Sequence, residues 1–365
     1  MAYVASYGND TPYGAKPGSV TPIWSSSTRG RPIRVGHDPS ALAITPDGRT
    51  VYVVSSPAAG SGTVTPITTA TGAAGKPIKI LGVPFLIAIT PNGKTAYVVS
   101  NAGVTPIRVA TNRAGRPIKV GDVPRAIAIT PNGRTAYVVS DGAGSGPGTV
   151  TPIATATNTA GRPITVRADP VAIAITPNGN TALVASDGPL PGIVTPISTA
   201  TNRARSPVTV GDFPKMIAIT PDGHTAYVVC ADDGAIWGTV TPIRTATGMA
   251  GKPITFRSSP SLIAIAPDGK TAYVVNRFGV TPIHTATGAK GGPITVGGTS
   301  PQDSLRVTAM AFSKDGRILY AVIWVGRFGS GKVIPITTAT KITGKPIKVG
   351  FGAFAIVISP LAHGT

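Results

Sequence analysis

Apolar residues recur along the chain in short runs bounded by Pro, Gly, Asp or Asn. Four runs follow one another in a fixed order: Ala-Ile-Ala-Ile-Thr (125–130 is typical), Thr-Ala-Tyr-Val-Val-Ser (135–140), Thr-Val-Thr-Pro-Ile (149–153) and Pro-Ile-Thr-Val (163–166). Short runs rich in Val, Ile, Tyr and Thr are typical of β-strands. The pattern therefore predicts four short strands in each copy of a repeat.

The four strands recur with a period of 40 to 47 residues. A period of this length is typical of a solenoid or a propeller, and four strands make one propeller blade. Each strand pattern occurs eight times, which predicts an all-β, eight-bladed β-propeller of four-stranded antiparallel blades. The period is marked by the residue that follows the first strand, which is Pro46, Pro91, Pro131, Pro177, Pro221, Pro267, Lys314 and Pro360.

The chain begins with the second strand of a blade and ends with the first. We therefore expect residues 353–359 to lie inside the strands near 2–6, 19–23 and 32–35, so that one blade combines 1–36 with 351–360. This pairing would close the ring and remove its open edges. The prediction is a single domain over residues 1–365.

Turn chemistry and composition agree with this fold. Pro-Asp-Gly or Pro-Asn-Gly follows the first strand, with Pro at the second position of a type I turn and Gly where φ must be positive. The chain has 45 Gly and 36 Pro, and every one of its 14 acidic residues is Asp, so the good helix former Glu is absent. Coiled coils, helical repeats and ordinary α/β enzymes are excluded.

The repeat resembles the YVTN (YncE-like) β-propeller family, because Ala-Tyr-Val-Val-Ser stands at its Tyr-Val-x-Asn strand and Asn276 supplies the Asn in one copy. The resemblance covers the whole chain and departs from the family in having eight blades where seven is common. It implies a bacterial, frequently extracytoplasmic binding protein with no shared catalytic motif. No signal peptide follows Met1 and no apolar run reaches membrane-helix length, so the localisation stays open.

Positions that differ between repeats are free to carry function. The residue that opens the first strand lies at the top mouth of a propeller channel, and it varies between aromatic, cationic and hydroxyl side chains. These residues make a candidate pocket for a small anionic or amphipathic ligand; alternatively, they fill the channel with solvated side chains. They are Ser40, Phe85, Arg125, Val171, Lys215, Ser261, Thr308 and Phe354.

Long top-face loops add further candidates. His37 precedes a first strand, Trp237 follows Asp232 and Asp233, and a third long loop carries Trp324, Arg327 and Phe328. Exposed aromatic residues on loops over a rigid scaffold are typical of binding surfaces; alternatively, these Gly-rich tips vary without a role. Trp237 and His37 therefore join the predicted ligand-binding residues.

The sequence leaves a divalent metal open as a cofactor. Asp141, Asp187, Asp232 and Asp233 lie in top loops of adjacent blades, and carboxylates of this kind hold Ca²⁺. No loop has the spacing of a known cage, so we expect no cofactor. The alternatives are a metal-dependent enzyme of lyase or lactonase type, and a d1-type haem protein with His37 as axial ligand.

The formal charge is +19, and it is concentrated on the bottom face. That face carries 18 cations from the hairpins and linkers against four Asp, whereas the top face is near neutral. An anionic surface or polymer is the predicted partner; alternatively, each copy adds one solubilising cation. Basic residues and aromatic residues do not alternate on this face, so nucleic acid is not expected.

Three other features suggest no chemistry. Residues 326–332 match half of a phosphate-binding loop, but Val333 replaces the hydroxyl residue and a strand follows instead of a helix. None of the four His lies within four residues of another or beside a Ser-centred elbow, so no hydrolase triad can be argued. Cys230 ends a second strand where other copies have Ser or Asn, which predicts a small structural residue.

The prediction is a monomeric, non-enzymatic binding or scaffold protein with a top-face site for a small molecule or a protein.

Overall fold

The second strand of each repeat is an almost uninterrupted apolar run because both of its faces are covered. In β5 (Thr50–Ser55) the side chains of residues 51 to 54 are 0% exposed. Val51 and Val53 pack against Tyr3 of one neighbouring sheet, whereas Tyr52 and Val54 pack in a second core on the opposite side. The two-residue side-chain period of a strand thus supplies both cores with apolar residues.

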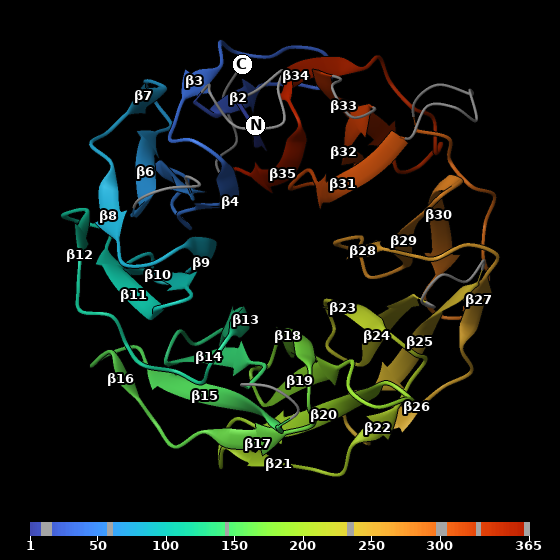
Figure 1. The fold of residues 1–365 in the computed structure, drawn as a ribbon. Coiled ribbons are helices and arrows are strands. Elements are labelled where there is room, and N and C mark those ends of the chain that lie inside the picture. The colour runs from blue at the N-terminus through green and yellow to red at the C-terminus, as the bar shows by residue number, and fades with distance from the viewer. Residues whose placement is uncertain are drawn as a thin grey trace. The chain divides into compact units, whose positions relative to one another are not determined.

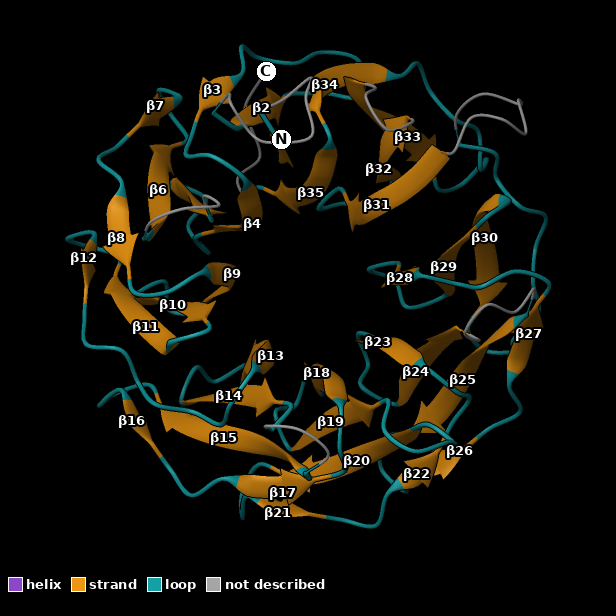
Figure 2. Cartoon of the chain, in the orientation of Figure 1, coloured by secondary structure: helices purple, strands orange, loops and turns teal. Residues whose placement is uncertain are grey.

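The computed structural model describes residues 1–8, 17–56, 61–142, 146–231, 237–296, 305–325 and 330–360. These residues form strands and turns without a helix (Figure 2). The fold is an eight-bladed β-propeller of four-stranded antiparallel blades, as the sequence predicts. The chain divides into two compact units, Met1–Pro117 with Ile294–Thr365 (unit 1) and Ile118–Pro293 (unit 2). The single domain over 1–365 stays a prediction.

Unit 1 contains four blades, whose first strands lie side by side in the order β31, β35, β4 and β9 (Figure 1). The strands are, in blade A, β1 (Ala2–Ser6), β2 (Ser19–Ile23), β3 (Ile33–Arg34) and β35 (Ala353–Ile358); in blade B, β4 (Pro39–Ile44), β5, β6 (Gly62–Thr68), β7 (Ala73–Ala74) and β8 (Ile78–Ile80); in blade C, β9 (Pro84–Ile89), β10 (Thr95–Ser100), β11 (Gly103–Arg108) and β12 (Arg113–Ala114); and in blade H, β31 (Leu305–Phe312), β32 (Ile318–Val325), β33 (Ser330–Thr337) and β34 (Ile347–Phe351).

Unit 2 contains the other four blades, with first strands in the order β13, β18, β23 and β28. The strands are, in blade D, β13 (Pro124–Ile129), β14 (Thr135–Ser140), β15 (Gly148–Ala154), β16 (Thr159–Ala160) and β17 (Ile164–Val166); in blade E, β18 (Pro170–Ile175), β19 (Thr181–Ser186), β20 (Ile193–Ser198), β21 (Arg203–Ala204) and β22 (Val208–Thr209); in blade F, β23 (Pro214–Ile219), β24 (Thr225–Ala231), β25 (Gly238–Arg244), β26 (Met249–Ala250) and β27 (Ile254–Phe256); and in blade G, β28 (Leu262–Ile265), β29 (Thr271–Asn276) and β30 (Gly279–His284).

The two ends of the chain share blade A, which confirms the expected pairing. Its strand order is β3-β2-β1-β35, and Val4 lies opposite Thr21 of β2 on one side and opposite Ile356 of β35 on the other. Figure 1 shows the red C-terminal strand beside the blue N-terminal ones. Strand β1 is consequently an interior strand with all five residues buried.

The proline of the third strand lies at the gap between the two short outer strands that pair with the third strand. In blade B, residues 62–64 of β6 pair with β8 and residues 67–68 pair with β7. Pro66 lies between these two paired stretches, so its missing N–H removes no ladder hydrogen bond there. Its carbonyl oxygen accepts a hydrogen bond from the Gly75 N–H at 2.7 Å.

Neighbouring blades are joined by hydrogen bonds from the second-strand tyrosine. The Tyr52 hydroxyl donates to Asn112 Oδ1 in the linker of blade C at 2.5 Å, and Tyr137 donates to Asn202 Oδ1 in blade E at 2.6 Å. Asn112 and Asn202 both have a φ of 52°, which Asn tolerates better than other side chains. Burial raises the pKa of Tyr52 to about 12, so its hydroxyl stays protonated and able to donate.

Each blade has two distinct ends. The hairpin between the first and second strands and the linker after the third strand lie together at the bottom end, where the Thr69 hydroxyl donates to the Gly48 carbonyl at 2.8 Å. The hairpin glycines adopt φ of 69° to 75°, as the turn assignment predicts. The entry into the first strand and the loop after the second strand lie at the top end.

Candidate functional site

The residues predicted to line the channel mouth occupy a repeated β-bulge. In blade D, Pro124 pairs with Ser140 and Ala126 pairs with Val139, so Arg125 between them has no partner in the ladder. The same shift occurs in all other blades except blade G, where Ser261 precedes β28 and donates its N–H to the Val275 carbonyl at 3.0 Å. The shifts fall at Ser40, Phe85, Val171, Lys215, Thr308 and Phe354. An extra residue of this kind redirects its side chain, and bulges are frequent next to functional sites.

A second repeated feature holds each bulge in place. The residue before the strand-opening proline adopts a positive φ in several blades, including Val123 at 49° and Phe213 at 50°. Its carbonyl accepts the N–H of the residue after the second strand, as Val123 does from Asp141 at 3.0 Å. A β-branched residue seldom adopts such a φ. Since the hydrogen bond recurs from blade to blade, we attribute the positive φ to the architecture of the blade and not to a functional site.

In unit 1 the predicted mouth residues contact neighbouring elements. The Ser40 hydroxyl donates to the Pro84 carbonyl at 3.2 Å, and the Thr308 hydroxyl donates to the Ala353 carbonyl at 2.9 Å. Both hydroxyls therefore join adjacent blades. Phe354 stacks on Tyr7 with ring centroids 4.8 Å apart, while Phe85 is half-buried.

In unit 2 one of the two predicted ligand-binding cations is already paired. A guanidinium nitrogen of Arg125 lies 2.8 Å from Asp141 Oδ2, and the Arg125 side chain remains 52% exposed. Lys215 is exposed, and its Nζ lies 5.8 Å from the centre of the Phe213 ring. Val171 is half-buried. The pocket at the channel mouth stays a prediction.

Two of the four candidate metal-binding aspartates lie in the described residues, in neighbouring blades. Asp141 faces Asp169, and their hydrogen bond and like charge raise the pKa of Asp169, against the opposite effect of Arg125. Asp187 follows β19, and its N–H donates to the Asp169 carbonyl at 2.8 Å. Asp232 and Asp233 lie outside the described residues. Among the residues that are described, no group of three or more His, Cys or acidic side chains could hold a metal ion.

Of the remaining loop candidates, His37, Trp237 and Trp324 lie in the described residues. His37 is exposed at the top end of blade B. Trp237 is 47% exposed and lines a cavity of about 330 Å³ together with Asp212 and Cys230. Trp324 contacts Phe351 edge to face at 6.3 Å. The loop residues Arg327 and Phe328, like most of the half-matching phosphate loop, lie outside the described residues.

Cys230 is a structural residue, as its position in the repeat indicates. It is 1% exposed, and burial raises the pKa of its thiol to about 12. A reactive thiol needs a lowered pKa and access to solvent. Gly211 packs directly against Cys230, because a Cβ at Gly211 would lie 3.0 Å from the Cys230 Cβ.

The bottom ends of the blades are strongly basic in both units. All eighteen cations of the hairpins and linkers are exposed. Some of these side chains contact the backbone: Lys290 Nζ donates to the Thr255 carbonyl of β27 at 2.6 Å, and Lys314 Nζ donates to the Pro360 carbonyl at 3.0 Å. The cations are Arg29, Arg31, Arg49, Lys76, Lys94, Arg113, Arg116, Lys314, Arg317, Lys341 and Lys345 in unit 1, and Arg134, Arg162, Arg203, Arg205, Lys252, Lys270 and Lys290 in unit 2.

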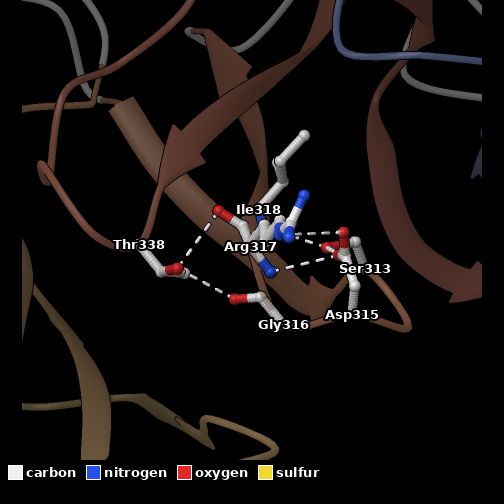
Figure 3. Close-up of polar contacts among 6 residues, drawn as sticks. All are labelled: Ser313, Asp315, Gly316, Arg317, Ile318 and Thr338. Atoms are coloured by element: carbon white, nitrogen blue, oxygen red, sulfur yellow. Dashed lines mark hydrogen bonds and ion pairs between the residues drawn. The ribbon is translucent and has the colours of Figure 1, made fainter.

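The four aspartates at the bottom ends are engaged in their own turns. Figure 3 shows Asp315 in blade H, which accepts the Ser313 hydroxyl at 2.6 Å and the Arg317 N–H at 3.1 Å. The Arg317 side chain lies farther away, with Nε 3.8 Å from Asp315 Oδ2. Hydrogen bonds from the hydroxyl and then from the backbone lower the pKa of Asp47, Asp222 and Asp315. These carboxylates thus stabilise turns.

Sequence reasoning missed a groove between blades F and G in unit 2. Its lining includes Phe256, Arg257, Ser258 and Phe278, none of which was a predicted site residue. A signal was present in the sequence. Most copies of the fourth strand end in Val-Gly or Ile-Leu, whereas this copy ends in Phe256-Arg257.

Comparisons with known proteins give the fold. No family model matches the sequence, and no curated protein is similar to it. Among solved structures, hydrazine synthase of Kuenenia stuttgartiensis is 20% identical with a TM-score of 0.61, covering 85% of this chain and 95% of that one. The dihydro-heme d1 dehydrogenase NirN, in complex with DHE, is 13% identical with a TM-score of 0.72, over 98% of this chain and 74% of that one.

A functionally unknown protein from Desulfotomaculum acetoxidans is also similar. It is 18% identical with a TM-score of 0.59, covering 80% of this chain and 94% of that one. These similarities show the β-propeller fold alone. Within the described residues there is also no helix that could cross a membrane.

Proposed function

We propose that this chain is a monomeric, non-enzymatic binding protein that docks on an acidic polymer through the bottom ends of its blades. The observation that carries the proposal is the exposed basic set: eleven cations with two aspartates in unit 1, and seven with two in unit 2. The aspartates are held in turn hydrogen bonds, so their carboxylates are poorly placed to neutralise distant cations. The excess positive charge remains available to a partner.

A polymer fits this surface better than a small ligand. The cations stand on separate hairpins and linkers, one to four for each blade, instead of converging on one cavity. A chain of repeated anionic groups can contact many of them at once, and each contact releases counterions. The metal-dependent lyase alternative is not favoured, because Asp141 and Asp187 belong to no group of three metal-binding side chains in the described part of the chain.

The experiment is a titration of fluorescently labelled polyphosphate, read by anisotropy from about 50 to about 200 mM NaCl. The test variant carries Arg49→Asn, Lys94→Asn and Arg134→Asn, since Asn180 already occupies this hairpin position in blade E. We expect affinity to fall roughly tenfold at the lower salt, with a shallower dependence on salt. The control removes three top-end cations by Lys215→Asn, Arg277→Asn and Arg306→Asn. Equal losses in the two variants would contradict the proposal.

The finer assignments rest on the repeat itself. We propose membership of the YVTN (YncE-like) group, supported by the Tyr-Val-Val strand in most copies, and with it a bacterial, extracytoplasmic setting where acidic polymers are exposed. A second site for a small molecule or a protein partner at the predicted channel mouth is supported by the bulges that redirect Arg125 and Lys215. The haem alternative is supported by the exposed His37 alone.

A further inference from the structure

The groove between blades F and G is a small cavity with a distinct lining. Its volume is about 250 Å³, and it lies in unit 2 between the outer strand β27 and the strands β29 and β30. An engineered cavity of about 150 Å³ is large enough for benzene. This groove therefore has room for one six-membered ring with a small substituent. Its lining consists of Phe256, Arg257, Ser258, Asn276, Phe278, Thr281, Lys290, Gly291 and Pro293.

Positive charge and aromatic rings alternate around this groove, and no acidic residue lines it. Lys290 Nζ lies 5.1 Å from the centre of the Phe256 ring, and the Arg277 guanidinium lies 5.6 Å from the Phe278 ring. Arg257 is exposed at its edge. Cations beside aromatic faces attract an anionic group, while the rings offer apolar contact to a planar one.

A buried polar atom in the lining has no partner within the described protein. Ser258 is 2% exposed, and its Oγ makes no hydrogen bond to the residues described. Leaving a hydroxyl unsatisfied costs free energy, so a bound ligand that supplies a partner would gain from it. Asn276, in contrast, has partners at both of its polar atoms, because it donates to Thr281 Oγ1 at 2.9 Å and accepts the Phe278 N–H at 2.8 Å.

The groove is also where the repeat departs from its own pattern at several positions at once. Phe256 replaces the Val or Ile of the seven other copies, and Arg257 stands where five copies have Gly. Asn276 replaces the Ser of five copies. In the linker the usual cation gives way to Gly292, and Lys290 supplies it two residues earlier. Blades are built without these residues elsewhere, so the fold does not require them.

We infer that the groove between blades F and G binds a small ring-bearing carboxylate. Arg257 and Lys290 attract the carboxylate, Phe256 and Phe278 contact the ring, and the Ser258 hydroxyl donates the hydrogen bond that the protein leaves unmade. This site shares Lys290 with the eighteen bottom-end cations, and the other residues of its lining are not among them.

Fluorine NMR with 4-fluorobenzoate as the probe tests the inference on the full chain. The test variants restore residues of other blades: Phe256→Val as in Val210, Arg257→Gly as in Gly211, and Ser258→Ala as in Ala168. We expect Arg257→Gly to weaken binding by about tenfold or more, as for loss of a charged hydrogen-bond donor. Ser258→Ala should weaken it about twofold to tenfold. Neutral 4-fluorobenzamide should bind the unmodified protein at least about tenfold more weakly.

Arg167→Gly is the matched control, because Arg167 occupies the same repeat position at the end of blade D and donates to the Pro189 carbonyl. It should leave binding unchanged, and all variants should melt within a few degrees of the original protein. Absence of binding, equal affinity for the benzamide, or a loss in Arg167→Gly as large as that in Arg257→Gly would overturn the inference.

Discussion

A single hairpin position shows how this protein uses its few carboxylates. Asp47 accepts the Thr45 hydroxyl at 2.5 Å and the Arg49 N–H at 3.0 Å. Asn92 makes the same two contacts in the next blade, with Thr90 at 2.7 Å and the Lys94 N–H at 3.0 Å. Asp and Asn are therefore geometrically equivalent here, and they differ in charge.

That equivalence gives a pH prediction at the residue scale. Because the folded protein lowers the pKa of Asp47, Asp222 and Asp315, these groups contribute stability above the unfolded Asp pKa of about 3.9 and lose it as pH falls through their lower folded values. Between neutral pH and a pH below about 4, the melting temperature of the triple Asp→Asn variant should fall less than that of the original protein. A melting temperature that falls equally steeply in both proteins would contradict the role of these hydrogen bonds.

The same three substitutions bear on the proposed function. They remove negative charge from the basic bottom ends without disturbing the turns, as the native Asn copies show. The triple variant should therefore bind polyphosphate more tightly than the original protein at low salt. Unchanged or weaker binding would place the polymer elsewhere.

At the scale of the element, a glycine at the start of the third strand lets the next blade approach. A Cβ on Gly148 would lie 2.5 Å from the ring of Pro170, which opens the first strand of blade E. Gly62 stands in the same relation to Pro84. Thus the Pro at these strand entries and the Gly of the preceding blade form one contact between blades.

Gly148→Ala should consequently destabilise the protein by about 1 to 3 kcal/mol, because the new methyl group overlaps a rigid ring. Gly292→Ala is the control, since a Cβ there would meet nothing within 4 Å. Its effect should stay within about 0.5 kcal/mol. Urea denaturation of the two variants measures the difference, and equal midpoints would show that the blades can separate enough to accept the methyl group.

The sequence predicted the elements well and the site less well. Alternation between turn residues and Val, Ile and Tyr is a local signal, so the strands, the hairpin glycines and the pairing of β35 with β1 were all foreseen. The bulge at Arg125 was not predicted, because it depends on the positive φ of Val123 and on the hydrogen bond that the Val123 carbonyl accepts. The ion pair of Arg125 with Asp141 was not predicted either, because the repeat pattern does not carry this pair of charges in its other copies.

At the scale of the whole molecule, net charge sets the response to salt. With a formal charge of +19, repulsion between like charges destabilises the folded state. Added NaCl should raise the melting temperature at neutral pH by screening this repulsion, while it weakens binding to polyphosphate. Differential scanning calorimetry from about 20 to about 300 mM NaCl tests the first effect. A melting temperature that falls with salt would show that attractive pairs dominate.

The shared blade A has a consequence for how the protein is made. Among the described strands β1 is synthesised first and its partner β35 last. At about 5–20 residues per second, β1 waits on the order of 20–70 s with one edge uncovered. An open apolar edge is a template for pairing with another chain. Nascent copies on neighbouring ribosomes are therefore at risk of capturing one another, and translation rate becomes a determinant of yield.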